Sequence, residues 1–433
     1  HSMAFYPGHE ALRKVEKLSN SMKVLLFSIG TRGDIEPFVV IAQLMQERGC
    51  DVICVFPEQY RDTVVSLGLS FKGFSREILD LMESKNAKLF FGKQASFLKR
   101  IRLLPGMASR SLQLAKGSLS LQHKIQMEEK PDTILYHPKC NYSVLWGMRT
   151  SCKTILVNPT VDPLTDLGGN YGKFLNKLKF HMVYTMKAVS LKIAAGKFKK
   201  DYRGTRIHVS SIKKAMLEKE KTIYTLSPSL FFKPAYSPLN THIVGFHERN
   251  KTTDWEPGEK LQQFINKNNN ILFISFGSMY NPNPEKITRS IVNVLETNNI
   301  PAIINTSRDG LKEIDATSGN IFFTNNLPYN WLFPKVYAVV HHGGCGTTHT
   351  ALKYGLPALI IPHILDQFFW EKTISSLKLG PKGISIHKFN EKNFETKLLD
   401  LYNNKDYKNN ALAISNKMQV ESNKNKLYEL IMS

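Results

Sequence analysis

A glycine-rich turn in the second half of the chain offers the clearest chemistry in the sequence. Residues 341–348 read HHGGCGTT and follow the apolar residues Val339 and Val340. A glycine-rich turn that opens a helix presents free backbone N–H groups and the positive end of the helix dipole, and together these bind anions. The threonine hydroxyls and His342 add further hydrogen-bond donors. We therefore expect a diphosphate to bind here, although both histidines could instead simply flank a helix, with one of them buried.

An earlier turn carries a carboxylate. Residues 30–34 read GTRGD and come directly after an apolar stretch at residues 22–29. The turn lacks the Gly-x-Gly-x-x-Gly pattern of dinucleotide-binding proteins. Ligands of α/β sheets bind at the carboxyl ends of the strands, so Asp34 would face a bound molecule. Because aspartate also favours the N-cap position of helices, the turn by itself leaves a purely structural role open.

Two further turns follow apolar strands. Residues 362–370 read PHILDQFFW, and the Asp366 carboxylate and Gln367 amide are groups that recognise sugar hydroxyls. Residues 275–279 read SFGSM, a small-residue turn that a phosphate can approach closely. The chain contains no Asp-x-Asp motif, so the sequence implies no metal ion.

Taken in their order along the chain, the four motifs resemble those of the sterol glucosyltransferase group of the UDP-glycosyltransferase family. Bacterial antibiotic glycosyltransferases of that family share much of the set, and the resemblance extends from residue 22 to about residue 430. It implies an α/β protein of the GT-B fold, with two Rossmann-like, doubly wound domains facing a central cleft. The implied function is that of an inverting, metal-independent transferase. It would move a hexose, most simply glucose, from a UDP-sugar to a hydroxyl of a lipophilic acceptor such as a sterol.

The resemblance also assigns roles to residues. Asp34 becomes the catalytic base that deprotonates the acceptor, and no cofactor besides the donor substrate is implied. Tyr329 departs from the pattern, because sterol enzymes commonly have histidine there. The residues implied on the donor side are Thr31, Arg32, Ser278, Leu327, Tyr329, His342, Cys345, Gly346, Thr347, Asp366 and Gln367.

Other functions stay open at this point. A polyketide, flavonoid or other small aglycone could replace the sterol, because acceptors contact the variable N-terminal half. A nucleotide-sugar 2-epimerase can share the fold, but these motifs are wrong for it. A non-enzymatic alternative is a basic protein that binds a membrane surface.

The remaining sequence supplies the elements that position these motifs. Short apolar runs alternate with helical spacings, which is typical of a doubly wound parallel sheet. The pattern predicts an N-terminal acceptor domain at residues 22–240 and a linker rich in proline and charge at residues 241–260. A nucleotide-sugar domain follows at residues 261–410. A helical tail at residues 411–433 is expected to pack back on the N-terminal domain.

The composition indicates the class of protein and its cellular compartment. Of the 433 residues, 42% are hydrophobic and 22% are charged, which excludes disordered and collagen-like classes. Five scattered cysteines favour reduced thiols and a cytoplasmic location over a disulfide framework. The apolar runs are too short for a transmembrane helix.

The net charge of +22 is concentrated in two segments of the N-terminal half. Residues 85–127 hold nine Lys or Arg and no acid, and residues 172–221 hold fourteen against three acids. Solvated helix faces and docking on an anionic membrane both fit this pattern. Nucleic acid fits poorly, because aromatic platforms are missing. The second segment has an apolar stripe that is more typical of a core face, at Phe174, Leu178, Met182, Met186, Val189 and Ile193.

Overall fold

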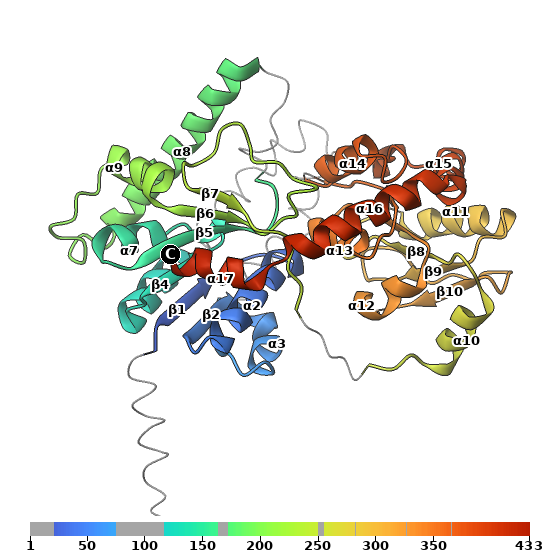
Figure 1. Ribbon diagram of the computed structural model, residues 1–433, viewed down its shortest axis with the longest axis horizontal. Helices are drawn as coiled ribbons and strands as arrows, with labels where there is room; N and C mark the ends of the chain where they lie inside the picture. The colour runs from blue at the N-terminus through green and yellow to red at the C-terminus, as the bar shows by residue number, and fades with distance from the viewer. Residues whose placement is uncertain are drawn as a thin grey trace, which may run out of the picture.

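The chain folds around two parallel sheets, each flanked by helices (Figure 1). The structure is a computed structural model and describes residues 21–74, 117–162, 172–249, 255–281, 283–325, 327–364 and 366–433. Most of the first cationic segment, residues 85–116, lies outside these residues. None of the described helices combines the length and the apolar character needed to cross a bilayer.

The N-terminal sheet has seven strands, all parallel, in the order β3-β2-β1-β4-β5-β6-β7. They are β1 (Lys23–Phe27), β2 (Asp51–Pro57), β3 (Ser70–Phe74), β4 (Thr133–Tyr136), β5 (Lys153–Asn158), β6 (Lys221–Tyr224) and β7 (Thr241–Ile243). Its helices are α2 (Arg32–Glu47), α3 (Arg61–Val65), α7 (Ser143–Arg149), α8 (Gly172–Gly196) and α9 (Val209–Lys214), with a further helix over residues 117–129. Shorter helical segments are η1 (Glu58–Tyr60), η2 (Pro138–Cys140) and η3 (Ala215–Lys219).

The C-terminal sheet has five parallel strands in the order β10-β9-β8-β11-β12. They are β8 (Leu272–Ser275), β9 (Ala302–Asn305), β10 (Ile321–Thr324), β11 (Ala338–His341) and β12 (Ala358–Ile360). The helices around it are α10 (Glu259–Lys267), α11 (Pro284–Thr297), α12 (Tyr329–Leu332), α13 (Cys345–Lys353), α14 (Gln367–Ser376) and α15 (Glu391–Asn403), with η4 (Phe333–Lys335) and η5 (Ile386–Lys388). The last two helices are α16 (Lys405–Glu421) and α17 (Lys424–Met432).

Continuous apolar runs form the central strands because both faces of each sheet are covered. In β1, Leu25 and Phe27 belong to the core on one face, whereas Val24 and Leu26 belong to the core on the other. Successive strand residues point to opposite faces, so a strand buried on both sides has no position for a polar side chain.

The boundary between the domains lies later than the sequence indicates. Thr241–Ile243, expected at the start of the linker, forms the edge strand β7 of the N-terminal sheet. A strand of three residues that begins just after Pro238 is too short to show an alternating pattern of apolar and polar residues. The chain then passes to the C-terminal sheet.

The chain returns to the N-terminal domain at its C-terminal end. Helix α16 lies along α13, and α17 packs against α2 (Figure 1). Leu427 and Ile431 of α17 are buried in the same core as Val24 and Leu26 of β1. The chain therefore crosses between the domains twice.

Candidate active site

Asp34 lies in the first turn of α2, three residues after the N-cap residue Thr31. The Thr31 backbone N–H donates to Asp34 Oδ2 at 2.8 Å. In return, the Asp34 backbone N–H donates to the Thr31 side chain, and the two contacts form a capping box. Gly30 makes room for this geometry, because a Cβ at that position would lie 2.0 Å from Asp34 Oδ2. The carboxylate thus has a structural role at the helix start, and its other oxygen, Oδ1, faces His137.

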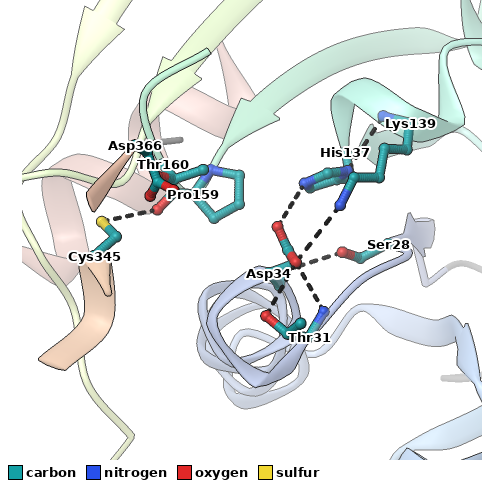
Figure 2. A network of polar contacts seen from close by, with 9 residues as sticks. All are labelled: Ser28, Thr31, Asp34, His137, Lys139, Pro159, Thr160, Cys345 and Asp366. Carbon is teal, nitrogen blue, oxygen red and sulfur yellow. Dashed lines mark hydrogen bonds and ion pairs between the residues drawn. The ribbon is translucent and has the colours of Figure 1, made fainter. Parts of the chain in front are cut away.

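His137 and Lys139 approach the same carboxylate from the next strand of the sheet (Figure 2). Strand β4 pairs with β1, so the residues after Tyr136 and after Phe27 meet at one edge. His137 Nε2 lies 3.2 Å from Asp34 Oδ1, and Lys139 Nζ lies 3.6 Å from Oδ2. Neither residue is among those predicted from the sequence.

The hydrogen bonds of His137 fix its tautomer. The Lys139 backbone N–H donates to His137 Nδ1 at 3.2 Å, so the ring proton is on Nε2 and is donated to Asp34. Burial lowers the pKa of His137, although Asp34 opposes the shift, and the ring is neutral at pH 7. His137 therefore serves as a donor that holds the carboxylate in place.

The pKa of Asp34 is set by opposing effects. Burial would raise it, but Lys139, His137 and the Thr31 N–H together hold it well below the ordinary value of 3.8. The carboxylate is ionised throughout the physiological range, and its side chain is only 15% exposed. Such a group can accept a proton only from a donor that comes into direct contact with it.

The turn after β11 opens helix α13 as the sequence predicts. Gly344 is the N-cap, and Cys345, Gly346 and Thr347 are the first three helical residues. The first N–H groups of a helix have no partner within it, so these three point out of the helix end. Gly343 has φ of +88°, and a Cβ there would lie 2.7 Å from Ile360. A glycine is therefore required where the chain turns into the helix.

The two histidines before this helix differ. His341 is fully buried in β11, and its Nδ1 accepts the Gly343 N–H at 3.0 Å. The His342 ring lies between Gly277 and Gly344 and hydrogen-bonds the Ser275 backbone. Burial lowers the pKa of His342 to about 4. Its Nδ1 is buried and has no hydrogen-bond partner among the described residues.

Three more residues that the sequence implies on the donor side differ in their exposure: Ser278, Leu327 and Tyr329. Ser278 is exposed in the turn after β8, whereas Leu327 is buried in the core. The Tyr329 ring stacks on Phe333, and its hydroxyl hydrogen-bonds Ser275 and Thr347. Burial raises the pKa of Tyr329. Its ring therefore packs in the core while its hydroxyl reaches the start of α13.

Residues from both domains meet near Asp366. The Thr160 hydroxyl, just beyond β5, donates to Asp366 Oδ2 at 3.1 Å (Figure 2). Burial raises the pKa of Asp366 to about 6, and Asp34 in the N-terminal domain adds to the rise. Arg32 similarly acts on the pKa of Tyr329 across the same interface. The turn after β1 therefore faces the start of α13 and the start of α14.

Gln367 and Cys345 are held by protein groups rather than left free. Gln367 Oε1 accepts the backbone N–H groups of His363 and Ile364 at 2.7 and 3.1 Å. Its amide oxygen therefore braces the turn before α14 and is not available to a sugar hydroxyl. Cys345 Sγ lies 3.5 Å from the Pro159 carbonyl, so the thiol faces the other domain while its backbone N–H stays at the helix end.

In the described part of the chain, no three or more His, Cys, Asp or Glu side chains are grouped so that they could hold a metal ion.

Known proteins resemble this chain in sequence. Residues 290–428 match the family model described as "Erythromycin biosynthesis protein CIII-like, C-terminal domain". The sterol 3-beta-glucosyltransferase UGT80A2 of Arabidopsis thaliana is 25% identical over 85% of this chain and 59% of its own length. The sterol 3-beta-glucosyltransferase of Kluyveromyces lactis is 26% identical over 90% of this chain and 33% of its own length. The chain thus spans less than two thirds of either relative.

Solved structures resemble it in fold. The glycotransferase of kitacinnamycin superposes with a TM-score of 0.70 at 14% identity, over 95% of this chain and 99% of the other. The spinosyn rhamnosyltransferase SpnG, complexed with thymidine diphosphate, gives 0.64 at 16% identity over 95% and 100%. The predicted GT-B fold and the predicted resemblance to sterol glucosyltransferases are both confirmed.

Proposed function

We propose that this GT-B chain, whose curated relatives are sterol 3-beta-glucosyltransferases, is an inverting glycosyltransferase. It transfers a hexose, most simply glucose, from a UDP-sugar to a hydroxyl of a lipophilic acceptor, a sterol in the first instance. One observation carries the proposal. An ionised, oriented carboxylate, Asp34, lies across the domain interface from a helix start suited to a diphosphate, and it acts electrostatically on Asp366 there.

The proposed reaction is a single displacement at the anomeric carbon. The acceptor oxygen forms a bond to C1 of the sugar from one face while the bond from C1 to the diphosphate oxygen breaks on the other. UDP leaves with the electron pair, and the acceptor proton passes to Asp34. Since attack and departure occur on opposite faces, an α-linked donor gives a β-linked product.

Asp34 is a weak base for an alcohol, because the pKa of an alcohol lies far above that of any aspartate. Proton transfer therefore has to accompany C–O bond formation, when the attacking hydroxyl becomes acidic. Among the described residues, Oδ1 accepts only the His137 proton, whereas Oδ2 accepts the Thr31 N–H and pairs with Lys139. We assign the proton-accepting role to Oδ1, which has the freer lone pair.

The start of α13 would hold the diphosphate. The N–H groups of Cys345, Gly346 and Thr347 and the helix dipole favour negative charge that develops as UDP leaves. The His342 ring, which lies beside Gly344, would border the same group, and Ser278 would present its exposed hydroxyl to it. Donors that are in place before the reaction stabilise the leaving group without reorganisation.

The acceptor assignment rests on the names of the curated relatives. Two fold neighbours are the glycotransferase of kitacinnamycin and the spinosyn rhamnosyltransferase SpnG, neither of which is named for a sterol, so a polyketide, flavonoid or other small aglycone is the second candidate. We also propose a cytoplasmic location, which the five free cysteines support.

The test combines a donor panel and an acceptor panel. The protein is incubated with UDP-glucose, UDP-galactose or TDP-glucose and with a sterol, a macrolide aglycone or a flavonoid. Mass spectrometry identifies the product, and NMR assigns its anomeric configuration. We expect a β-glucoside of the sterol with UDP-glucose. Acceptor-dependent UDP release that yields an α-linked product, or no product with any acceptor, would contradict the proposal.

A further inference from the structure

Helix α8 has two apolar faces, and only one of them is buried. Phe180, Tyr184, Ala188 and Leu191 pack in the core of the N-terminal domain. Seven large apolar side chains of the same helix are exposed instead: Phe174, Leu175, Leu178, Met182, Met186, Val189 and Ile193. Six of these make up the apolar stripe whose sequence pattern is more typical of a core face, all except Leu175.

The exposed side chains form one continuous face. At about 100° per residue, the seven positions fall within a sector about 120° wide, roughly opposite the buried side chains. From Phe174 to Ile193 the face is about 28 Å long at a rise of 1.5 Å per residue. Phe174 is 76% exposed and Ile193 is 68% exposed, so the whole length is open to solvent. Twelve large hydrophobic side chains are exposed in the described part of the chain, and α8 holds seven of them.

The charges beside this face have a single sign. Helix α8 contains five lysines and no acidic residue. Lys177 and Lys192 are exposed. The segment that follows, residues 197–206, adds five further Lys or Arg against Asp201 alone. An apolar face with cationic borders is complementary to an anionic bilayer surface, where the apolar side chains enter the acyl boundary and the lysines meet the headgroups.

The position of α8 connects this face to the proposed active site. One end of the helix stands away from both sheets, and the first buried side chain in its described part is Phe180 (Figure 1). At its middle, Lys187 Nζ pairs with Asp162 Oδ2 at 3.3 Å. Asp162 is two residues beyond Thr160, which binds Asp366. The helix is therefore tied to the segment whose Thr160 contacts the C-terminal domain.

We propose that the outward face of α8 inserts into the interfacial region of an anionic membrane and docks the N-terminal domain there. Docking needs neither donor nor catalysis, so it can be tested apart from the proposed transferase activity. The insertion is parallel to the membrane surface, as expected for an amphipathic helix with cationic borders.

The test is sedimentation with vesicles of phosphatidylcholine alone or with 30% phosphatidylserine. The variant Met182→Glu/Met186→Glu places two carboxylates on the outward face, one helical turn apart and both in exposed positions. Val420→Glu is the matched control, because Val420 is an 81% exposed apolar residue of α16 in a part of the chain with no such face. Calorimetry with UDP and circular dichroism check that each variant is folded.

We expect the wild-type protein to bind the anionic vesicles at least tenfold more tightly than the neutral ones. The double variant should lose at least tenfold, and the control should bind as the wild type does. Lys177→Gln/Lys192→Gln should weaken binding to anionic vesicles alone. Binding should also decrease between about 0.05 and 0.5 M salt, as screening increases. Equal binding of wild type and double variant would overturn the proposal. The proposal would also be overturned if the wild-type protein self-associates through this face in ultracentrifugation and does not bind vesicles.

Discussion

The substitution Asp34→Asn separates the two roles that the structure gives to one carboxylate. As the partner of Thr31, Asp34 stabilises the start of α2, and as the partner of His137 and Lys139 it is held ionised at the domain interface. The asparagine oxygen can still accept the Thr31 N–H, but the amide cannot take a proton from an acceptor hydroxyl. We expect a modest loss of stability and a large loss of transfer.

The two effects differ enough to be told apart. Losing the charge that binds His137 and Lys139 costs about 1–3 kcal/mol of unfolding free energy. Losing a general base lowers the transfer rate about 10²–10⁴-fold, which is about 2.7–5.4 kcal/mol in activation free energy. UDP affinity should stay unchanged, because the groups proposed to bind the diphosphate belong to the C-terminal domain.

The pH dependence gives an independent check on the environment of Asp34. Because its pKa is held below the value in the unfolded chain, the ionised group stabilises the fold above the ordinary value of 3.8. This contribution is lost as the pH falls further. The difference in unfolding free energy between wild type and Asp34→Asn should therefore be full at pH 6 and should shrink below about pH 4.

The assays are initial rates of UDP release at saturating donor, UDP calorimetry, and chemical denaturation at several pH values. Asp51→Asn serves as the matched control, since Asp51 is a carboxylate at the other end of the N-terminal sheet, 3.9 Å from Lys23. It should leave the transfer rate unchanged. An Asp34→Asn protein that binds UDP normally and transfers within threefold of the wild-type rate would refute the assignment and leave Asp34 as a helix cap.

Three further predictions concern histidines. His137→Phe keeps a ring at this position but removes the hydrogen-bond donor to Asp34, so kcat should fall about tenfold with KM for the sugar donor unchanged. His137→Gln should restore part of the loss. The acid limb of the pH–rate profile should move to higher pH, and an unmoved limb would argue against a positioning role. His342→Ala removes the ring that lies beside Gly344 at the start of α13, so calorimetry should show UDP binding weakened about tenfold with the fold intact, whereas unchanged UDP affinity would place the diphosphate elsewhere. Burial lowers the pKa of four C-terminal-domain histidines below the ordinary 6.5, so unfolding should bind protons at acidic pH. The unfolding free energy should therefore fall as the pH decreases from 6.5 towards 4, by up to about 1.4 kcal/mol per pH unit for each histidine. Denaturation curves recorded across this range measure the change. These four are His341, His342, His349 and His363.

Sequence patterns predicted the strands and the turns that follow them, because a strand buried on both faces leaves a continuous apolar run. They could not show which strands are neighbours. His137 and Lys139 follow β4, and only the pairing of β4 with β1 brings them to Asp34. The signal in the sequence for these two residues is that a histidine and a lysine come directly after a buried strand.

Side-chain direction was the second limit. The positions of Asp366 and Gln367 at the start of α14 follow from the sequence, but the use of the Gln367 oxygen by two backbone N–H groups does not. Helical periodicity likewise shows that α8 has an apolar stripe at Met182 and Met186, without showing whether protein covers it. Whether protein covers this stripe depends on which face of α8 packs against the sheet.

The placement of α17 has a consequence for how the protein is made. Leu427 and Ile431 complete the core beside β1 and α2, almost 400 positions away in the chain. A ribosome delivers β1 and α2 long before it delivers α17, so the N-terminal domain emerges with part of its core still open. The C-terminal domain, whose sheet lies wholly between these two segments, can assemble in the meantime. The domain synthesised first is therefore the one that finishes folding last.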